Sequence, residues 1–273
     1  MTKIYYFSGT GNTYWSAKKL AEKFDAAEMV PIQKIMAKMT ETMTEKSVIS
    51  IEADSVVFMF PAYAYGIPVM MRRFIERAEI RAPCIEACAD IRAPYIAALV
   101  TYGSSPGGAL AEATRVLRKK NLRLSYAGRI PAVENYIPIF GAQSEKMQRK
   151  RLALQVAATE KAAAAIKELS TKSVLTFHPF ASFVTALFRL AVSGMDGLFT
   201  LDSACNGCGF CASVCPAHAI TMSENHPVFA RGCEQCQACL NFCPQHAINF
   251  GRMKKNTARY HHPEVSAAEL FGV

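Results

Sequence analysis

Residues 205–216 read CNGCGFCASVCP, and residues 233–244 read CEQCQACLNFCP. Both stretches have the spacing C-x2-C-x2-C-x3-C-P, and the second begins 28 residues after the first. The similarity continues past the cysteines, because PAHAI at 216–220 corresponds to PQHAI at 244–248. An internal repeat of this kind predicts two structural halves related by a pseudo-twofold axis.

The spacing of these cysteines indicates iron–sulfur chemistry. Two intervening residues let three thiolates curve around three corners of a [4Fe–4S] cluster, and in paired ferredoxins the fourth cysteine ligates the other cluster. The pattern therefore predicts two [4Fe–4S] clusters in a small α+β ferredoxin domain over residues 201–252. The predicted ligands are Cys205, Cys208, Cys211 and Cys243 for one cluster, and Cys233, Cys236, Cys239 and Cys215 for the other.

Other uses of the cysteines fit the sequence less well. A disulfide framework needs an oxidising compartment, whereas the opening residues do not resemble a secretory signal, so we expect a cytoplasmic protein. Paired zinc sites usually separate two C-x2-C arms by a longer loop. Cys84 and Cys88 lie outside the repeat, and we expect them to be free buried thiols rather than a metal site or a redox pair.

Upstream of the repeat, short apolar runs alternate with helical patterns over residues 1–170. This rhythm predicts an α/β domain with a doubly wound, five-stranded parallel sheet. Ligands of such sheets bind beyond the carboxyl ends of the strands. We expect strands near 4–7, 29–32, 55–60, 95–101 and 123–129, and helices near 12–24, 69–78, 108–120 and 143–169.

Three loops follow these strands. The first, FSGTGNT at 7–13, offers hydroxyls and backbone N–H groups at a helix N-terminus, which suits a phosphate. A dinucleotide-binding loop fits less well, because Tyr14 stands where the third glycine belongs. The second, PAYAYGIP at 61–68, provides aromatic rings that can stack on a flat heterocycle. The glycines of the third, TYGSSPGG at 101–108, allow close backbone approach to the polar edge of such a ring.

Together the three loops resemble the flavodoxin family, and the whole chain resembles the flavodoxin–ferredoxin fusion proteins of anaerobic bacteria. The resemblance implies FMN, with its phosphate in the first loop and its isoalloxazine ring between the other two. The chain departs from typical flavodoxins in charge, since those are strongly acidic and its formal net charge is +9. The implied FMN-binding residues are Ser8, Thr10, Gly11, Asn12, Thr13, Pro61, Ala62, Tyr63, Ala64, Tyr65, Gly66, Thr101, Tyr102, Gly103, Gly107 and Gly108.

Two further segments complete the predicted organisation. Residues 171–200 are an apolar linker, too short in its unbroken apolar part (173–188) for the roughly 18–20 residues of a membrane span. We expect a helical stripe in it to pack the ferredoxin domain against the sheet, with a peripheral membrane or partner-docking helix as the alternative. Residues 253–273 are expected to be a surface extension. The stripe consists of Phe183, Val184, Leu187, Phe188 and Ala191.

These cofactors predict a redox function. FMN exchanges one or two electrons and each cluster one, so we expect electron transfer between them and on to a redox partner such as a ferredoxin, a flavodoxin or a reductase. Basic runs at 115–123 and 146–151 suit an acidic partner, or are simply solvated helix faces. The alternative is an FMN-dependent reductase of a small acceptor such as a quinone, with Tyr65, Tyr102 and residues 136–140 over the pocket. No nucleic-acid recognition motif accompanies the charge.

Overall fold

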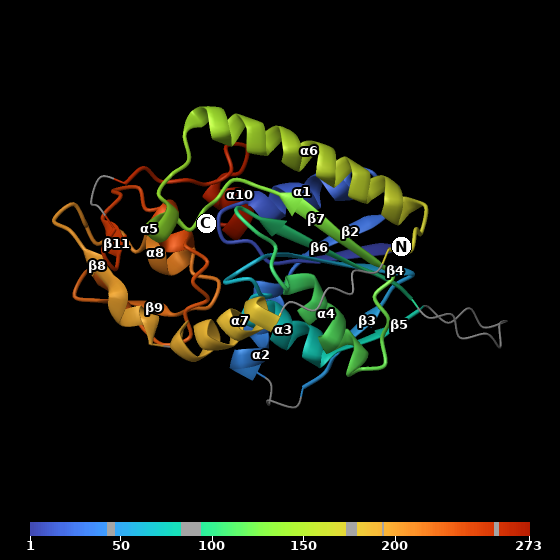
Figure 1. The fold of residues 1–273 in the computed structure, drawn as a ribbon. Helices are drawn as coiled ribbons and strands as arrows, with labels where there is room; N and C mark the ends of the chain where they lie inside the picture. The colour runs from blue at the N-terminus through green and yellow to red at the C-terminus, as the bar shows by residue number, and fades with distance from the viewer. Residues whose placement is uncertain (43–46, 83–93, 173–178, 193, 254–256) are drawn as a thin grey trace.

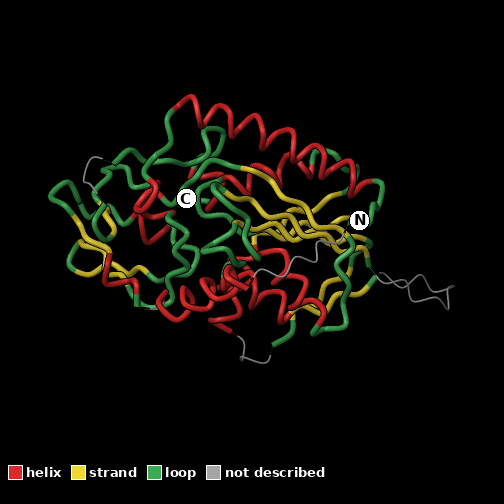
Figure 2. The backbone as a smooth tube through the Cα atoms, in the orientation of Figure 1, coloured by secondary structure: helices red, strands yellow, loops and turns green. Residues whose placement is uncertain are grey.

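The computed structural model describes residues 1–42, 47–82, 94–172, 179–192, 194–253 and 257–273. At its centre lies a five-stranded sheet in the order β2-β1-β4-β6-β7, with every neighbouring pair parallel (Figures 1 and 2). Counting only these strands, the order is 2-1-3-4-5, which is the flavodoxin-like order. The predicted doubly wound sheet is confirmed. The strands are β1 (Thr2–Tyr6), β2 (Ala27–Pro31), β4 (Ser55–Pro61), β6 (Tyr95–Tyr102) and β7 (Tyr126–Pro131).

Helices cover both faces of this sheet. Successive side chains of a strand point to opposite faces, and β4 shows the consequence. Phe58 belongs to the core cluster that contains Phe74 of α3, whereas Met59 belongs to the cluster that contains Leu20 of α1 and Ile166 of α6. Figure 1 shows α1 and α6 on one side of the sheet and α2, α3 and α4 on the other. These helices are α1 (Asn12–Ala21), α2 (Ile32–Thr42), α3 (Val69–Arg77), α4 (Ala109–Arg118) and α6 (Glu145–Lys167).

Helix α2 was not predicted, and neither were three short elements of the first 170 residues. β3 (Ile49–Glu52) and β5 (Ala78–Arg81) pair in parallel as a separate two-stranded sheet. Helix α5 (Ile137–Phe140) follows β7 and lies between the sheet and the cysteine-rich region. Segments of four residues carry too little periodicity to be distinguished from a loop.

The cysteine-rich region has the internal symmetry that its repeat predicts. Helix α8 (Phe210–Ser213) and helix α9 (Ala238–Asn241) occupy equivalent positions, and each follows a residue of positive φ, Gly209 or Gln237. His218 and His246 are also equivalent, with φ of 49° and 51°. Two antiparallel pairs accompany the helices, β9 (Ile220–Ser223) with β10 (His226–Phe229) and β8 (Phe199–Leu201) with β11 (Ile248–Phe250).

Helix α7 (Pro179–Val192) buries a different face from the one expected. Phe183 and Leu187 of the predicted stripe are 63% and 50% exposed, and Ala191 is exposed as well. The buried positions are Ala181, Thr185 and Val192. Because α7 is apolar on nearly every side, its sequence pattern cannot show which side is buried. The buried side is selected by the hydrogen bonds that Thr185 and Arg189 make to the loop after β4. Among the described residues no helix is long and apolar enough to span a membrane.

The expectation of a surface tail is wrong for much of residues 257–273. Tyr260, His262, Val265 and Leu270 are at most 4% exposed. The segment returns from the cysteine-rich region to the first face of the sheet and ends in α10 (Ala267–Phe271), beside α1 (Figure 1). Its apolar residues are spaced too irregularly to predict this packing.

Candidate cofactor sites

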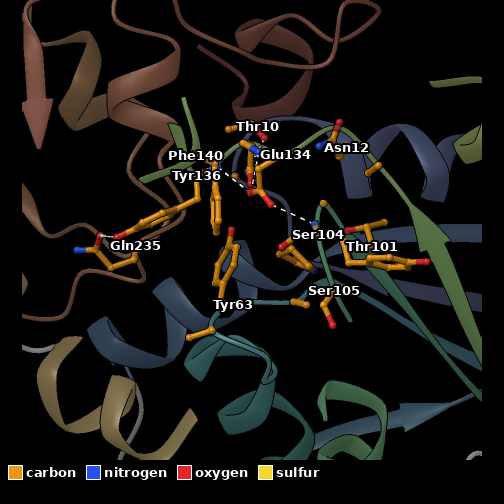
Figure 3. A pocket seen from close by; sticks show the side chains of 18 of the residues that line it. Thr10, Asn12, Tyr63, Thr101, Ser104, Ser105, Glu134, Tyr136, Phe140 and Gln235 are labelled. Carbon is orange, nitrogen blue, oxygen red and sulfur yellow. Dashed lines mark hydrogen bonds between the residues drawn. The ribbon is translucent and has the colours of Figure 1, made fainter. Parts of the chain in front are cut away.

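A cavity of about 270 Å3 lies at the carboxyl ends of β1, β4 and β6 (Figure 3). All three predicted loops line it, so the structure brings together the segments that the sequence assigned to one ligand. Of the residues implied for FMN, only Gly11, Gly66, Gly107 and Gly108 do not line the cavity. Residues 136–140 contribute Tyr136, Ile139 and Phe140 to the wall.

The first loop presents backbone donors, while several of its side chains already have protein partners. Gly11 has a φ of 93° at the start of α1, and the first N–H groups of a helix have no partner within it. The Asn12 amide donates to the Val133 carbonyl over 2.9 Å. The Thr13 hydroxyl lies 2.7 Å from that of Thr101, and the Thr10 hydroxyl accepts a hydrogen bond from Asn135. A phosphate here would therefore meet backbone N–H groups and shared hydroxyls.

The second loop is a tight turn that other elements hold in place. Tyr63 and Gly66 exchange two backbone hydrogen bonds of 2.9 Å, and Ala64 and Tyr65 between them have φ values of 43° and 67°. Positive φ strains residues that carry a Cβ. The conformation is stabilised from α7, where the Thr185 hydroxyl donates to the Ala64 carbonyl over 2.8 Å.

A buried ion pair supports the same loop. Arg189 of α7 lies 2.5 Å from Glu112 of α4, and its guanidinium also donates to the Ile67 carbonyl. The Glu112 carboxylate accepts the Ile67 N–H over 3.1 Å. Glu112 and Arg189 were not predicted to support this loop, because a charged residue on a helix normally indicates a solvated face. Thr185 was not predicted to do so either.

A fourth segment that lines the cavity, residues 132–135, was not predicted from the sequence. The Glu134 carboxylate accepts backbone N–H groups from Ser104, Asn135 and Tyr136 at 3.1–3.2 Å (Figure 3). It thereby fixes the third loop and the chain after β7 relative to each other. Its position after a strand could have predicted it, because β7 ends at the same edge of the parallel sheet as β1, β4 and β6, where ligands bind.

The eight cysteines of the repeat border two further cavities, each of about 20 Å3. Cys215, Cys233, Cys236 and Cys239 line one, and Cys205, Cys208, Cys211 and Cys243 line the other. The fourth cysteine of each run thus lies with the first three of the other run, as the ligand sets predict. No three His, Cys, Asp or Glu side chains among the described residues converge as the ligands of a single ion.

Several of these thiols lie in an apolar environment. Burial raises the pKa of Cys233 and of Cys211 to about 11, and burial raises the pKa of Cys236 and Cys239 further. Thiolates are stable in such surroundings only when a positive partner compensates their charge, and soft sulfur donors suit iron. The donor set and the cavities therefore fit iron–sulfur clusters.

Residues 204–248 match a family model described as a 4Fe-4S dicluster domain. The chain joins a domain of flavodoxin-like fold to this matching segment, residues 204–248, which is called the dicluster region below. No curated protein matches the sequence. Cys84 and Cys88 lie outside the described residues.

Several solved structures are similar to part of this chain at low sequence identity. The Trp repressor binding protein of Bacillus subtilis is 14% identical, with 64% of this chain and 100% of that chain covered and a TM-score of 0.37. A flavodoxin of Megasphaera elsdenii is 15% identical, with 59% and 99% covered and a TM-score of 0.34. An azoreductase of Bacillus anthracis is 14% identical, with 60% and 98% covered and a TM-score of 0.36. The TM-scores are low, and the fold assignment rests on the strand order.

The flavodoxin-like domain and the dicluster region meet at the cavity. Gln235 lines the cavity of about 270 Å3, while its neighbours Glu234 and Cys236 line the nearer cysteine cavity. The Tyr136 hydroxyl donates to Gln235 over 3.3 Å (Figure 3). Gly9 is so close to Cys236 that an added Cβ would collide with the Cys236 carbonyl group. Consecutive residues of the chain, Gln235 and Cys236, therefore line the two cavities.

One buried polar group lies beside each of these two cavities, the Tyr63 hydroxyl at the larger and the Glu234 carboxyl at the cysteine cavity. Among the described residues, the Tyr63 hydroxyl has no hydrogen-bond partner, and neither has one carboxylate oxygen of Glu234. Burial raises the pKa of Glu234 to about 7, although the backbone N–H groups of Met70 and Val69, together with Arg73, oppose the shift. Burial also raises the pKa of Tyr63. Both groups are therefore expected to be mainly uncharged near the cysteine cavity at slightly acidic pH.

Proposed function

We propose that this protein transfers electrons between FMN in the flavodoxin-like domain and two [4Fe–4S] clusters in the dicluster region, and passes them to a redox partner. When bound, FMN exchanges one or two electrons and each cluster one. The observation that carries the proposal is that consecutive residues line the two cavities, Gln235 the larger one and Cys236 the nearer cysteine cavity. Short separation and exclusion of water are what a protein contributes to such a step.

The chain's own residues would hold the groups as follows. The N-terminus of α1 and the hydroxyl of Ser8 face the cavity where the phosphate belongs. Tyr63 and Phe140 both line the cavity (Figure 3), so their rings would pack against a flat ring bound there. The cluster held by Cys236 would be shielded from water on the side of the flavin cavity, since Gln235 is 1% and Cys236 is 7% exposed.

Reconstitution under anaerobic conditions tests this function. Protein loaded with iron, sulfide and FMN should retain about eight iron atoms and one FMN per chain. Reduction with a photochemical donor should then bleach flavin and cluster absorbance together. About two iron atoms per chain, stoichiometric zinc, or FAD in place of FMN would contradict the cofactor assignment.

The acceptor is proposed to be an acidic redox protein. Lys146, Arg149 and Lys150 are exposed at the start of α6, which follows the pocket-lining helix α5, and positive charge accelerates encounter with an acidic partner. Reduced protein should be reoxidised rapidly by an acidic ferredoxin or flavodoxin, and more slowly as ionic strength rises. The absence of any salt dependence would remove the acidic partner from the proposal. Because the cluster thiols require reducing conditions, we place the protein in the cytoplasm.

A second candidate function is reduction of a small, flat acceptor. The observation that favours it is the apolar wall beyond the three loops, formed by Ile139, Phe140, Val184 and Phe188. Rapid, saturable reoxidation by one class of quinone or nitro compound, with proteins inactive as acceptors, would select this reductase over the carrier.

A further inference from the structure

The C-terminal strap, defined as residues 257–271, contacts both cofactor regions. On the dicluster side, the Arg259 guanidinium donates to the carbonyls of His246 and Ile248 over 2.7 and 2.8 Å. The Tyr260 N–H donates to the Asn241 side chain over 2.9 Å. Asn241 closes helix α9, which carries the predicted cluster ligand Cys239.

On the flavodoxin-like side, the strap lies against the first loop. The Tyr260 hydroxyl donates to the Asn12 side-chain oxygen over 2.8 Å, and the His262 N–H donates to the Thr10 carbonyl over the same distance. A Cβ on Gly11 would come within 3.0 Å of both His262 and Val265. The backbone of the first loop at Gly11 therefore packs directly against the side chains of His262 and Val265 in the strap.

These contacts and the short stretch of chain from Thr10 to Asn12 together form a closed ring. Asn241 donates to the Asn135 carbonyl over 3.3 Å, and the Asn135 amide donates to the Thr10 hydroxyl over 2.8 Å. The chain leads from Thr10 to Asn12, and the hydrogen bond from the Tyr260 hydroxyl to Asn12 closes the ring. Asn12, Asn241 and Tyr260 are 7%, 3% and 4% exposed. Buried polar groups that lose a partner cost more than the bond itself contributes, so the members of such a ring move together.

We propose that the C-terminal strap sets the separation between the flavin cavity and the cavity of Cys215, Cys233, Cys236 and Cys239, with Tyr260 as the positioning residue. The inference rests on the proposed function, because the separation of flavin and cluster matters only if electrons pass between them. The coupling of the two regions through Tyr260 is independent of that function. The first loop and α9 are coupled through Tyr260, which binds α9 with its backbone N–H and the first loop with its hydroxyl and lines neither cavity.

The test compares Tyr260→Phe with the matched control Tyr95→Phe. Both remove one hydroxyl, but the Tyr95 hydroxyl donates to the Ser170 carbonyl, remote from both cavities. Hydrogen–deuterium exchange is measured on the anaerobically loaded chain. In Tyr260→Phe the amides of 8–13 and of 238–243 should exchange faster together, by about fivefold for one net hydrogen bond. Tyr95→Phe should change neither segment.

Electron transfer provides the second readout. After photochemical reduction of the flavin, one electron leaves it and one oxidised cluster gains it, and the rate is followed by absorbance. With iron and FMN contents unchanged, Tyr260→Phe should slow this step on the order of tenfold, as a small displacement of reacting groups does. Arg259→Met, which acts from the dicluster side, should give the same pattern and serves if Tyr260→Phe does not fold.

Faster exchange in only one of the two segments, or in neither, overturns the strap proposal, as does an unchanged transfer rate in both strap variants. A wild-type protein that shows no transfer between flavin and clusters contradicts the proposed function instead. In that case the exchange experiment alone decides whether the strap couples the two regions.

Discussion

The backbone of Gly9 lies directly against the carbonyl group of Cys236, and only a residue without a Cβ fits there. Gly9 belongs to the predicted phosphate loop and Cys236 to a predicted cluster-ligand run, so this contact joins the two halves of the molecule. Gly9→Ala should destabilise the fold by about 1–3 kcal/mol, because the backbones must separate. Gly197→Ala is the control, since nothing lies within 4 Å of its Cβ position. Denaturant unfolding measures both, and equal stabilities would show that the contact is not tight.

The cysteine cavities predict which cluster each fourth cysteine serves. Cys215→Ala should lower the iron content from about eight to about four atoms per chain and leave the cluster of Cys205, Cys208 and Cys211. Cys243→Ala should remove that cluster and leave the other. Iron analysis combined with electron paramagnetic resonance of each variant checks the assignment. The opposite pattern of losses would mean that each run binds its own cluster.

The Arg189–Glu112 pair predicts a remote effect on flavin binding. Arg189→Met leaves the buried Glu112 carboxylate with Arg72 at 3.9 Å as its nearest cationic group, and frees the Ile67 carbonyl. The second loop should loosen, raising the Kd for FMN about tenfold. Arg81→Met, which breaks an exposed pair with Glu79, should have no effect. Flavin fluorescence titration measures the Kd. Identical values for the two variants would show that the Arg189–Glu112 pair does not hold the second loop in its FMN-binding conformation.

The hydroxyl pair of Thr13 and Thr101 predicts a direct effect. Thr13→Val keeps the side-chain volume and removes one hydroxyl from the cavity wall, so FMN should bind about tenfold more weakly while the iron content stays unchanged. Thr114→Val makes the same change in α4, where the hydroxyl donates to the Leu110 carbonyl away from the cavity. Loss of FMN from both variants would point to a general loss of structure.

His262 predicts a pH dependence of stability. Burial lowers its pKa from 6.5 to about 4, against an opposing effect of Glu264. The unfolded chain therefore binds a proton at higher pH than the folded chain does. The contribution of His262 to stability is complete above pH 6.5 and is lost as pH falls toward 4, by up to about 3 kcal/mol.

His262→Phe retains a ring to stack on Trp15, which lies 5.0 Å from the imidazole, and cannot take up the proton. Its unfolding free energy should depend less on pH between 4 and 6.5 than that of the wild type. His261→Phe is the neighbouring control. Parallel pH profiles for wild type and His262→Phe would show that the imidazole does not titrate with unfolding.

The sequence by itself determined the cysteine runs, the buried strands and the three loops at their ends. These are local patterns, in which spacing within a dozen residues carries the chemistry and hydrophobic periodicity marks the element. It also predicted the doubly wound sheet, because strands and helices alternate over residues 1–170.

Only the tertiary structure decided how the two regions meet. Glu112, Glu134 and Arg189 resemble ordinary surface charges in the sequence, and their partners lie on distant segments. Helix α7 is apolar on nearly every side, so its contacts with the second loop select the buried face. Tyr260 binds Asn12 across 248 positions of the chain, and no local pattern encodes a hydrogen bond of that range.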